Sequence, residues 1–201
     1  MKRIGIFGGS FSPPHKGHFR AISAFLASEE PDEMLVIPAH TPPHKMLKGD
    51  ASPADRMEMC RIAFSELPVT ISDMELLRGG TSYTVLTLRE LKREDKCLIL
   101  LCGTDMFLTL DTWYSAREIF SLAEIVYMRR EEDADAVRDA LAATAARYRR
   151  DYGATVREIL CDPLEISSTD IRRMLAENEP TDRYLDARVR EYIDRCNLYR
   201  T

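Results

Sequence analysis

The chain has 201 residues, of which 45% are hydrophobic and 30% charged, and its formal net charge is -5. This ordinary globular composition excludes disorder of the chain as a whole, and the length predicts one compact domain over residues 1–201. No apolar run approaches the roughly 18 residues of a membrane span, and the short apolar N-terminus breaks into glycines, which argues against secretion. Net acidity argues against general nucleic-acid binding.

The cysteines are odd in number, scattered, and form no C-x-x-C pair. Such a set argues against a disulfide framework, a zinc ribbon and a thioredoxin-type site. We therefore expect reduced, buried, structural thiols in a cytoplasmic protein. The five residues are Cys60, Cys97, Cys102, Cys161 and Cys196.

Short apolar strands alternate with helices along the chain, which is typical of an α/β fold with a doubly wound parallel sheet. In chain order, hydrophobic spacing and turn residues predict a strand at 3–7, a loop at 10–16, a helix at 17–29, a strand at 34–37 and a loop at 38–52. A helix at 53–67, an extended segment at 69–77, a helix at 83–92 and a strand at 98–101 follow. The rest of the chain is predicted to form a short helix ending at 119–122, a strand at 125–128, a helix at 133–150, a strand at 156–160, and helices at 169–176 and 187–196.

The first predicted strand ends in Gly8-Gly9, and a loop with two prolines leads from it to His15 and His18. Glycines let a backbone approach a phosphate closely, and free N–H groups at the next helix start can receive it. The loop matches neither G-x-G-x-x-G nor a Walker A loop. Two imidazoles three residues apart can face one point and donate hydrogen bonds to a phosphate. The alternative is one packing histidine and one solvated histidine.

A second segment of interest is Ile166-Ser167-Ser168-Thr169-Asp170-Ile171-Arg172. Its Ser and Thr residues cap a predicted helix whose free N–H groups form another anion site. Arg172 follows Ser168 by one helical turn, so a hydroxyl and a guanidinium can converge on phosphate oxygens. The alternative is an ordinary capped helix with a surface arginine.

Together the two segments, G-x-F-x-P-x-H-x-G-H and I-S-S-T-x-I-R, resemble the nucleotidyltransferase superfamily of adenylyl- and cytidylyltransferases. Five further pieces make the chain similar to the bacterial nicotinate-nucleotide adenylyltransferase family over nearly its whole length. They are Pro42-Pro43-His44-Lys45, Ser82-Tyr83-Thr84, Gly103-Thr104-Asp105, Trp113-Tyr114 and Arg130. The resemblance implies a single Rossmann-like nucleotidyltransferase domain, with the I-S-S-T-x-I-R helix and a C-terminal helix within 166–198.

The resemblance also implies a reaction of NAD biosynthesis, in which ATP and nicotinate mononucleotide give deamido-NAD and pyrophosphate. The mononucleotide phosphate would attack the α-phosphorus in line, with no covalent enzyme intermediate. His15, His18 and Arg172 would be the catalytic residues, and His18 would stabilise the transition state at the α-phosphate. Mg²⁺ would enter with ATP, held mainly by phosphate and water rather than by protein ligands.

The implied ATP-binding residues begin with the glycine loop, continue with a ribose site, and end with a grip on the β- and γ-phosphates. They are Gly8, Gly9, Ser10, Phe11, Gly17, Gly103, Asp105, Ile166, Ser167, Ser168 and Thr169. The implied mononucleotide-binding residues are His44, Lys45, Thr84, Trp113, Tyr114 and Arg130. Among these, Trp113 would stack on the nicotinate ring and Thr84 would donate to its carboxylate.

Two positions depart from the family pattern. Ser12 stands where the family usually has Asp after the Phe of the first motif, which removes a carboxylate that could approach a metal. Glu131 stands where a proline often follows the arginine, so Arg129 is an alternative to Arg130 for the acceptor contact.

Other functions stay open at this stage. Within the class, the acceptor could be the amidated mononucleotide or phosphopantetheine. Outside it, the chain could be a non-catalytic nucleotide-binding module, because fold does not imply function. An NAD-dependent oxidoreductase is disfavoured by the absent G-x-G-x-x-G. We expect small-molecule substrates, no nucleic acid and no membrane partner, and we leave a homo-oligomer open.

Overall fold

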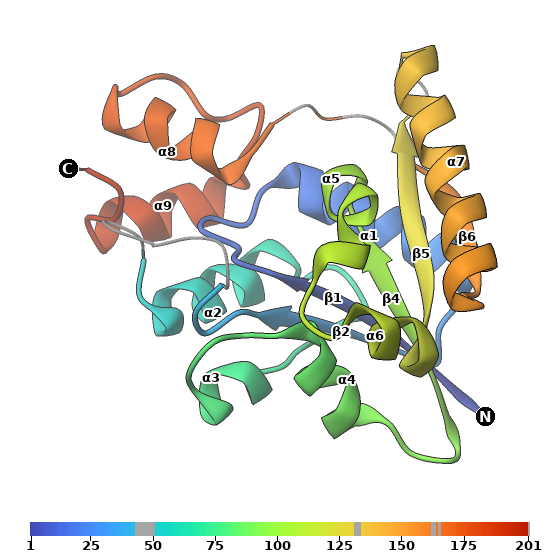
Figure 1. The fold of residues 1–201 in the computed structure, drawn as a ribbon. Helices are drawn as coiled ribbons and strands as arrows, with labels where there is room; N and C mark the ends of the chain where they lie inside the picture. The colour runs from blue at the N-terminus through green and yellow to red at the C-terminus, as the bar shows by residue number, and fades with distance from the viewer. Residues whose placement is uncertain (43–50, 131–133, 162–163, 165, 201) are drawn as a thin grey trace. The chain divides into compact units, whose positions relative to one another are not determined.

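A computed structural model describes residues 1–42, 51–130, 134–161, 164 and 166–200 of the chain (Figure 1). The chain divides into two compact units, which we describe separately. Unit 1 comprises Met1–Phe7, Ala21–Leu35 and Tyr83–Pro163. Unit 2 comprises Gly8–Arg20, Val36–Ser82 and Leu164–Thr201. The single domain over 1–201 stays a prediction.

A six-stranded sheet with the order β3-β2-β1-β4-β5-β6 confirms the predicted doubly wound, Rossmann-like architecture. The strands are β1 (Lys2–Gly9), β2 (Glu33–Pro38), β3 (Thr70–Ile71), β4 (Lys96–Cys102), β5 (Ala123–Arg130) and β6 (Val156–Cys161). Within unit 1, β1 pairs with β4, β4 with β5, and β5 with β6, all in parallel. These strands are short apolar runs because both faces of a parallel sheet are covered, and residues 98–102 of β4 are all buried.

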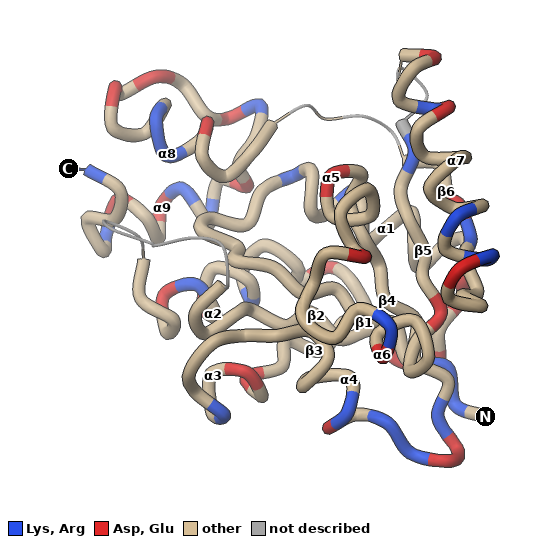
Figure 2. Tube along the Cα trace, in the orientation of Figure 1, with Lys and Arg blue, Asp and Glu red and all other residues tan. Residues whose placement is uncertain are grey.

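The helices of unit 1 lie around these strands. They are α4 (Thr84–Leu91), α5 (Thr104–Leu108), the 3₁₀ turn η1 (Leu110–Thr112), α6 (Ala116–Leu122) and α7 (Asp135–Tyr152). α7 buries Tyr148, whose hydroxyl donates to Phe107 O at 2.8 Å and to Asp111 Oδ1 at 2.9 Å. Residues of both charge signs lie along α7 (Figure 2). This mixture fits a helix with one face packed and the other in water.

α1 (Lys16–Glu29) belongs to unit 2 at its start and to unit 1 from Ala21 onward. The other helices of unit 2 are α2 (Pro53–Ala63), α3 (Met74–Arg78), α8 (Ser168–Ala176) and α9 (Ala187–Arg195). α2 begins with Ser52, whose side chain accepts from Asp55 N, followed by a proline at the first helical position. α2 and α9 pack against each other.

The structure differs from the prediction in three places. The sequence predicts an extended segment at 69–77, but the structure has only the two-residue β3 there, followed by α3. Leu77 in α3 is 79% exposed, so it does not pack into the core as a residue of a buried strand would. The helix at 53–67 ends at Ala63, because Phe64 leaves helical geometry as its C-cap. The short α5 and η1 were not predicted. Polar residues and a glycine between 103 and 112 mask their helical spacing.

The prediction of buried thiols holds for three cysteines and is wrong for two. Cys60, Cys102 and Cys161 are buried, Cys97 is half-buried, and Cys196 is exposed just after α9. Burial raises the pKa of the Cys102 thiol to about 12, which keeps it protonated and unreactive. Of the helices that the structure describes, none is both long and apolar enough to span a membrane.

Candidate active site

The glycine loop of unit 2 is held in place by a buried arginine. Arg56, on α2, is 1% exposed, and it donates from Nη1 to Ser10 O at 2.8 Å and from Nη2 to His40 O at 3.1 Å. Ala39 N also donates to Gly9 O at 2.9 Å. The loops at residues 9–10 and 39–40 are therefore fastened side by side.

The two histidines of the first motif lie against each other. The ring centroids of His15 and His18 are 3.7 Å apart, and the backbone N–H of His15 donates to Nδ1 of His18 at 3.1 Å. Burial lowers the pKa of His15 to about 4, and burial together with His15 lowers the pKa of His18 well below its usual value. His18 is therefore neutral at pH 7. Its proton sits on Nε2, because Nδ1 is the acceptor.

His15 brings a buried nitrogen without a partner. Its side chain is 9% exposed, and Nδ1 has no hydrogen-bond partner among the residues that the structure describes. A Cβ added at Gly17 would lie 2.9 Å from this nitrogen, so only glycine leaves room beside it. An unsatisfied buried polar atom is costly and marks a place where a ligand can complete the bonding.

The sequence predicts free backbone N–H groups at the start of α1, but some of these N–H groups already donate to acceptors within the protein. The N–H of His15 is used by His18, and Lys16 N donates to Tyr184 O at 2.8 Å. The side chain of Lys16 donates to Asp182 O at 2.7 Å. The imidazoles, rather than these N–H groups, are thus the donors that this turn offers to an anion.

The second motif contacts the first, although about 155 residues separate them in sequence. Ser168 Oγ donates to Pro13 O at 2.9 Å, and Arg172 Nη1 donates to Ser12 O at 2.8 Å. Arg172 Nη2 also donates to Thr169 Oγ1 at 3.2 Å, which orients the guanidinium. Arg172 is therefore anchored to the glycine loop rather than being a free surface arginine.

Ser167 caps α8 in the ordinary way. Its Oγ accepts from Asp170 N at 3.1 Å, and its N–H donates to Asp170 Oδ2 at 3.0 Å, which is a complete capping box. Hydrogen bonds from Ser167 lower the pKa of Asp170, so this carboxylate stays ionised at the helix start. Ile166 lies half-buried just ahead of this cap.

Ser12, which departs from the family pattern, forms a side-chain hydrogen bond. The Ser12 side chain is fully buried, and its Oγ lies 3.0 Å from the hydroxyl of Tyr199. The Ser12 hydroxyl thus points into the protein interior, toward Tyr199 in the C-terminal tail (residues 196–200). Phe11 is also buried, with its ring 5.0 Å from the ring of His18.

Sequence reasoning missed two residues that fasten the loop, Arg56 and Tyr199. The signal for Arg56 was present, because it lies one turn before Met59 and Cys60 and two turns before Ala63, on the buried face of α2. A charged residue on an apolar stripe indicates a buried, hydrogen-bonded cation. For Tyr199 the local sequence carries no comparable signal.

In unit 1, Tyr83 of the S-Y-T segment lies beside Tyr114 of the W-Y segment. Thr84 is the first residue of α4, and the ring of Tyr83 lies 4.7 Å from the ring of Tyr114 at an angle of 41°. Tyr114 is 57% exposed, and Trp113 beside it is half-buried. The tryptophan is therefore not a core residue, and part of its surface is accessible to a ligand.

The G-T-D segment follows β4. Gly103 is the N-cap of α5, so Asp105 in the first turn is not the capping residue. Asp105 is exposed, and its backbone oxygen accepts from Thr109 Oγ1 at 2.9 Å. A Cβ at Gly103 would meet only Met128 Cε at 3.8 Å, so the protein itself does not require a glycine there.

Arg129 is paired with Glu158 on the neighbouring strand, at 2.8 Å from Nε to Oε1. His44, Lys45 and the side chain of Arg130 lie outside the part of the chain that the structure describes. His40 is a loop residue, as expected: its N–H donates to Ser82 Oγ at 2.9 Å, and its Nδ1 lies 3.0 Å from Gly80 O.

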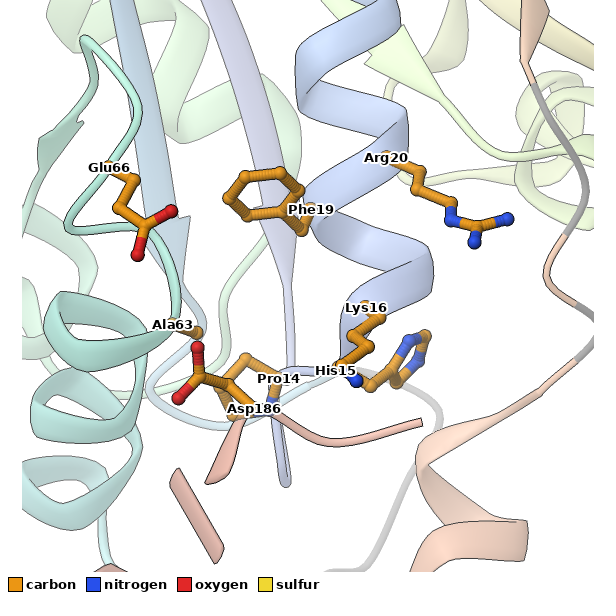
Figure 3. Close-up of a pocket in the computed structure, with 8 residues that line it drawn as sticks. All are labelled: Pro14, His15, Lys16, Phe19, Arg20, Ala63, Glu66 and Asp186. Carbon is orange, nitrogen blue, oxygen red and sulfur yellow. The ribbon is translucent and has the colours of Figure 1, made fainter. Parts of the chain in front are cut away.

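Unit 2 also contains a small cavity of about 210 Å³ beside the first turns of α1 (Figure 3). Three of its charged groups are already engaged: Lys16 donates to Asp182 O, and Asp186 and Glu66 both pair with Arg188 at 2.9 and 3.1 Å. We assign it no ligand. Within the described part of the chain, no three His, Cys, Asp or Glu side chains gather as a metal site would require.

Comparison with known proteins shows the family of this chain. The model of the Cytidylyltransferase-like family matches residues 6–174. A Chromobacterium violaceum protein named "Probable nicotinate-nucleotide adenylyltransferase" is 36% identical over an alignment of 209 residues, which covers 98% of this chain and 99% of its own. A protein of the same name from Geobacter sp. (strain M21) is 38% identical over an alignment of 213 residues, which covers 98% of each chain.

A solved structure of similar fold is the Plasmodium falciparum nicotinic acid mononucleotide adenylyltransferase complexed with APC. It aligns with a TM-score of 0.74 at 17% identity and covers 99% of this chain and 98% of its own. The chain belongs to the cytidylyltransferase-like family of nucleotidyltransferases and, within it, to the group of the nicotinate-nucleotide adenylyltransferases.

Proposed function

We propose that this protein transfers the adenylyl group of ATP to nicotinate mononucleotide, giving deamido-NAD and pyrophosphate. The observation that carries the proposal is the contact between the two motifs, in which Arg172 and Ser168 bond the carbonyls of residues 12 and 13. This contact joins the helix of Arg172 to the loop that leads to His15 and His18, all within unit 2. Full-length relatives that carry this activity in their names support the choice of substrates.

The chemistry on the ATP side is charge neutralisation. The mononucleotide phosphate attacks the α-phosphorus in line, and the bond to the pyrophosphate leaving group breaks, so no enzyme nucleophile is needed. Charge develops on the non-bridging oxygens of the α-phosphorus. The Nε2–H of His18, held by the bond from His15 N to its Nδ1, is a preorganised neutral donor for these oxygens.

Arg172 complements His18 with a full charge. Its guanidinium is oriented by Ser12 O and Thr169 Oγ1, and its positive charge is assigned to the β- and γ-phosphates. His15, whose ring lies against that of His18, is assigned to the same anion. Mg²⁺ would come with ATP and neutralise phosphate oxygens, coordinated mainly by phosphate and water.

The acceptor side is assigned to unit 1. The half-buried indole of Trp113 offers a face for the nicotinate ring, and Thr84 offers a hydroxyl at the start of α4 for its carboxylate. Asp105, exposed in the first turn of α5, would accept from the ribose hydroxyls of ATP. We also propose a cytoplasmic location, and we leave a homo-oligomer open.

The test is a coupled assay of pyrophosphate release with Mg²⁺-ATP and three acceptors: nicotinate mononucleotide, nicotinamide mononucleotide and phosphopantetheine. We expect the highest kcat/KM with nicotinate mononucleotide, because the start of α4 at Thr84 favours a negatively charged carboxylate over a neutral amide. A higher kcat/KM with the amide would change the substrate and leave the reaction class intact. Equal use of phosphopantetheine, or no pyrophosphate with any acceptor, would refute the proposal.

A further inference from the structure

The C-terminal tail of the chain returns to the glycine loop of unit 2. Tyr199, two residues from the end of the sequence, is 6% exposed, and its hydroxyl lies 3.0 Å from Ser12 Oγ. Ser12 itself is completely buried. A hydrogen bond between two buried hydroxyls, 187 positions apart, therefore joins the tail to the loop that carries the first motif.

The tail is built to place this hydroxyl. After α9, the backbone turns through left-handed conformations at Asn197 and Tyr199, with φ of 53° and 60°. Leu198 N donates to Ile193 O at 3.0 Å, and Arg200 Nη2 donates to Asp194 Oδ1 at 2.6 Å, so the turn is tied back to the helix. A tyrosine adopts a left-handed φ only where its surroundings favour it, and here the buried ring and the bond to Ser12 do so.

Ser12 stands at the centre of the proposed phosphate site. Its backbone oxygen accepts from Arg172 Nη1 at 2.8 Å. Its neighbour Phe11, also at a left-handed φ of 48°, packs against the ring of His18. A shift of Ser12 would therefore be passed to both groups that we assign to the ATP phosphates.

We propose that Tyr199 is a positioning residue for ATP: by holding Ser12 Oγ, it fixes the loop that orients Arg172 and His18. The inference rests on the proposed function for its ligand, since it assigns the effect to binding of ATP phosphates. It explains why a serine can stand at position 12, because a hydroxyl there is held by the phenol of the tail.

Tyr192 provides a matched control. It lies on α9 in the same unit, and its hydroxyl donates to Asp55 Oδ1 at 2.9 Å rather than to Ser12. Tyr199→Phe and Tyr192→Phe each remove one phenolic hydroxyl that hydrogen-bonds a side chain. We expect each to lower Tm by a similar, small amount, about 2–4 °C. A purely structural role of Tyr199 would leave the two variants alike in every other respect.

The experiment measures Kd for Mg²⁺-ATP by calorimetry, and kcat and KM for each substrate, in both variants and in Ser12→Ala. We expect Tyr199→Phe and Ser12→Ala to weaken ATP binding and lower kcat/KM for ATP about tenfold, with KM for the mononucleotide unchanged. Tyr192→Phe should keep wild-type values. The double variant Ser12→Ala/Tyr199→Phe should be no weaker than either single variant, because both act through one contact.

Wild-type ATP affinity and kcat/KM in both Tyr199→Phe and Ser12→Ala would overturn the inference, as would equal losses in Tyr199→Phe and Tyr192→Phe. Additive losses in the double variant would also count against it. If the wild-type protein binds ATP but releases no pyrophosphate with any acceptor, the proposed function fails. The ATP affinities of the variants would still decide the role of Tyr199.

Discussion

Replacing Gly17 by Ala should separate stability from activity in this protein. Gly17 is the second residue of α1, where its φ suits any residue, and alanine favours a helix over glycine by up to about 1 kcal/mol. The new Cβ, however, would lie 2.9 Å from Nδ1 and 3.0 Å from Cε1 of His15. These distances are shorter than ordinary van der Waals contact, so the imidazole has to move.

The size of that movement follows from the packing. Contact distances of 3.4 Å or more are normal for a Cβ, so the His15 ring must shift by about 0.5 Å. The ring is nearly buried, and it lies 3.7 Å from the ring of His18, which therefore shifts with it. Displacements of reacting groups near 1 Å cost about 10²-fold in rate, so we expect kcat to fall about 10- to 100-fold.

The assay is pyrophosphate release with Mg²⁺-ATP and nicotinate mononucleotide, combined with thermal unfolding by circular dichroism. We expect Gly17→Ala to keep or raise Tm while kcat falls. Lys16→Ala is the control, because this exposed neighbour on α1 already has a Cβ, and it should keep near-normal kcat. Normal kcat in Gly17→Ala would show that the position of the imidazole pair does not matter. A large drop in Tm would show that the glycine serves folding.

Three further predictions concern single side chains. His15 has a pKa of about 4 in the folded state and 6.5 when unfolded, so the folded protein binds fewer protons than the unfolded chain. The free energy of unfolding therefore falls as the pH drops below 6.5, by about 2–3 kcal/mol at pH 4.5. Urea unfolding at pH 7.5 and 4.5 should show this loss reduced in His15→Gln but not in Lys16→Gln; equal losses in all three proteins would contradict it. His18→Ala should lower kcat about 10²–10³-fold with little change in KM for ATP or in the circular dichroism spectrum, since one transition-state donor is lost. Near-normal kcat, or unfolding, would make this histidine structural. Trp113→Ala should raise KM for the mononucleotide more than KM for ATP, because stacking acts equally in the ground and transition states; a selective rise in KM for ATP would move Trp113 to the other substrate.

The sequence was sufficient for the α/β class and for the two motifs. Buried parallel strands read as continuous apolar runs, and both phosphate motifs are local patterns of glycine, histidine and capping residues whose chemistry is evident from residue type. The short elements α3, α5 and η1 could not be predicted from the sequence, because helices of three to five residues are too short to show a helical hydrophobic periodicity.

The tertiary structure decided which groups serve the loop. Arg172 was expected to face a ligand, and only the fold shows that part of its guanidinium is used to bond Ser12 O. Arg56 and Tyr199 hold the same loop from a different helix and from the C-terminal tail. Hydrogen bonds between residues 46 to 187 positions apart leave no local pattern, because they depend on where the packing of unit 2 brings those segments together.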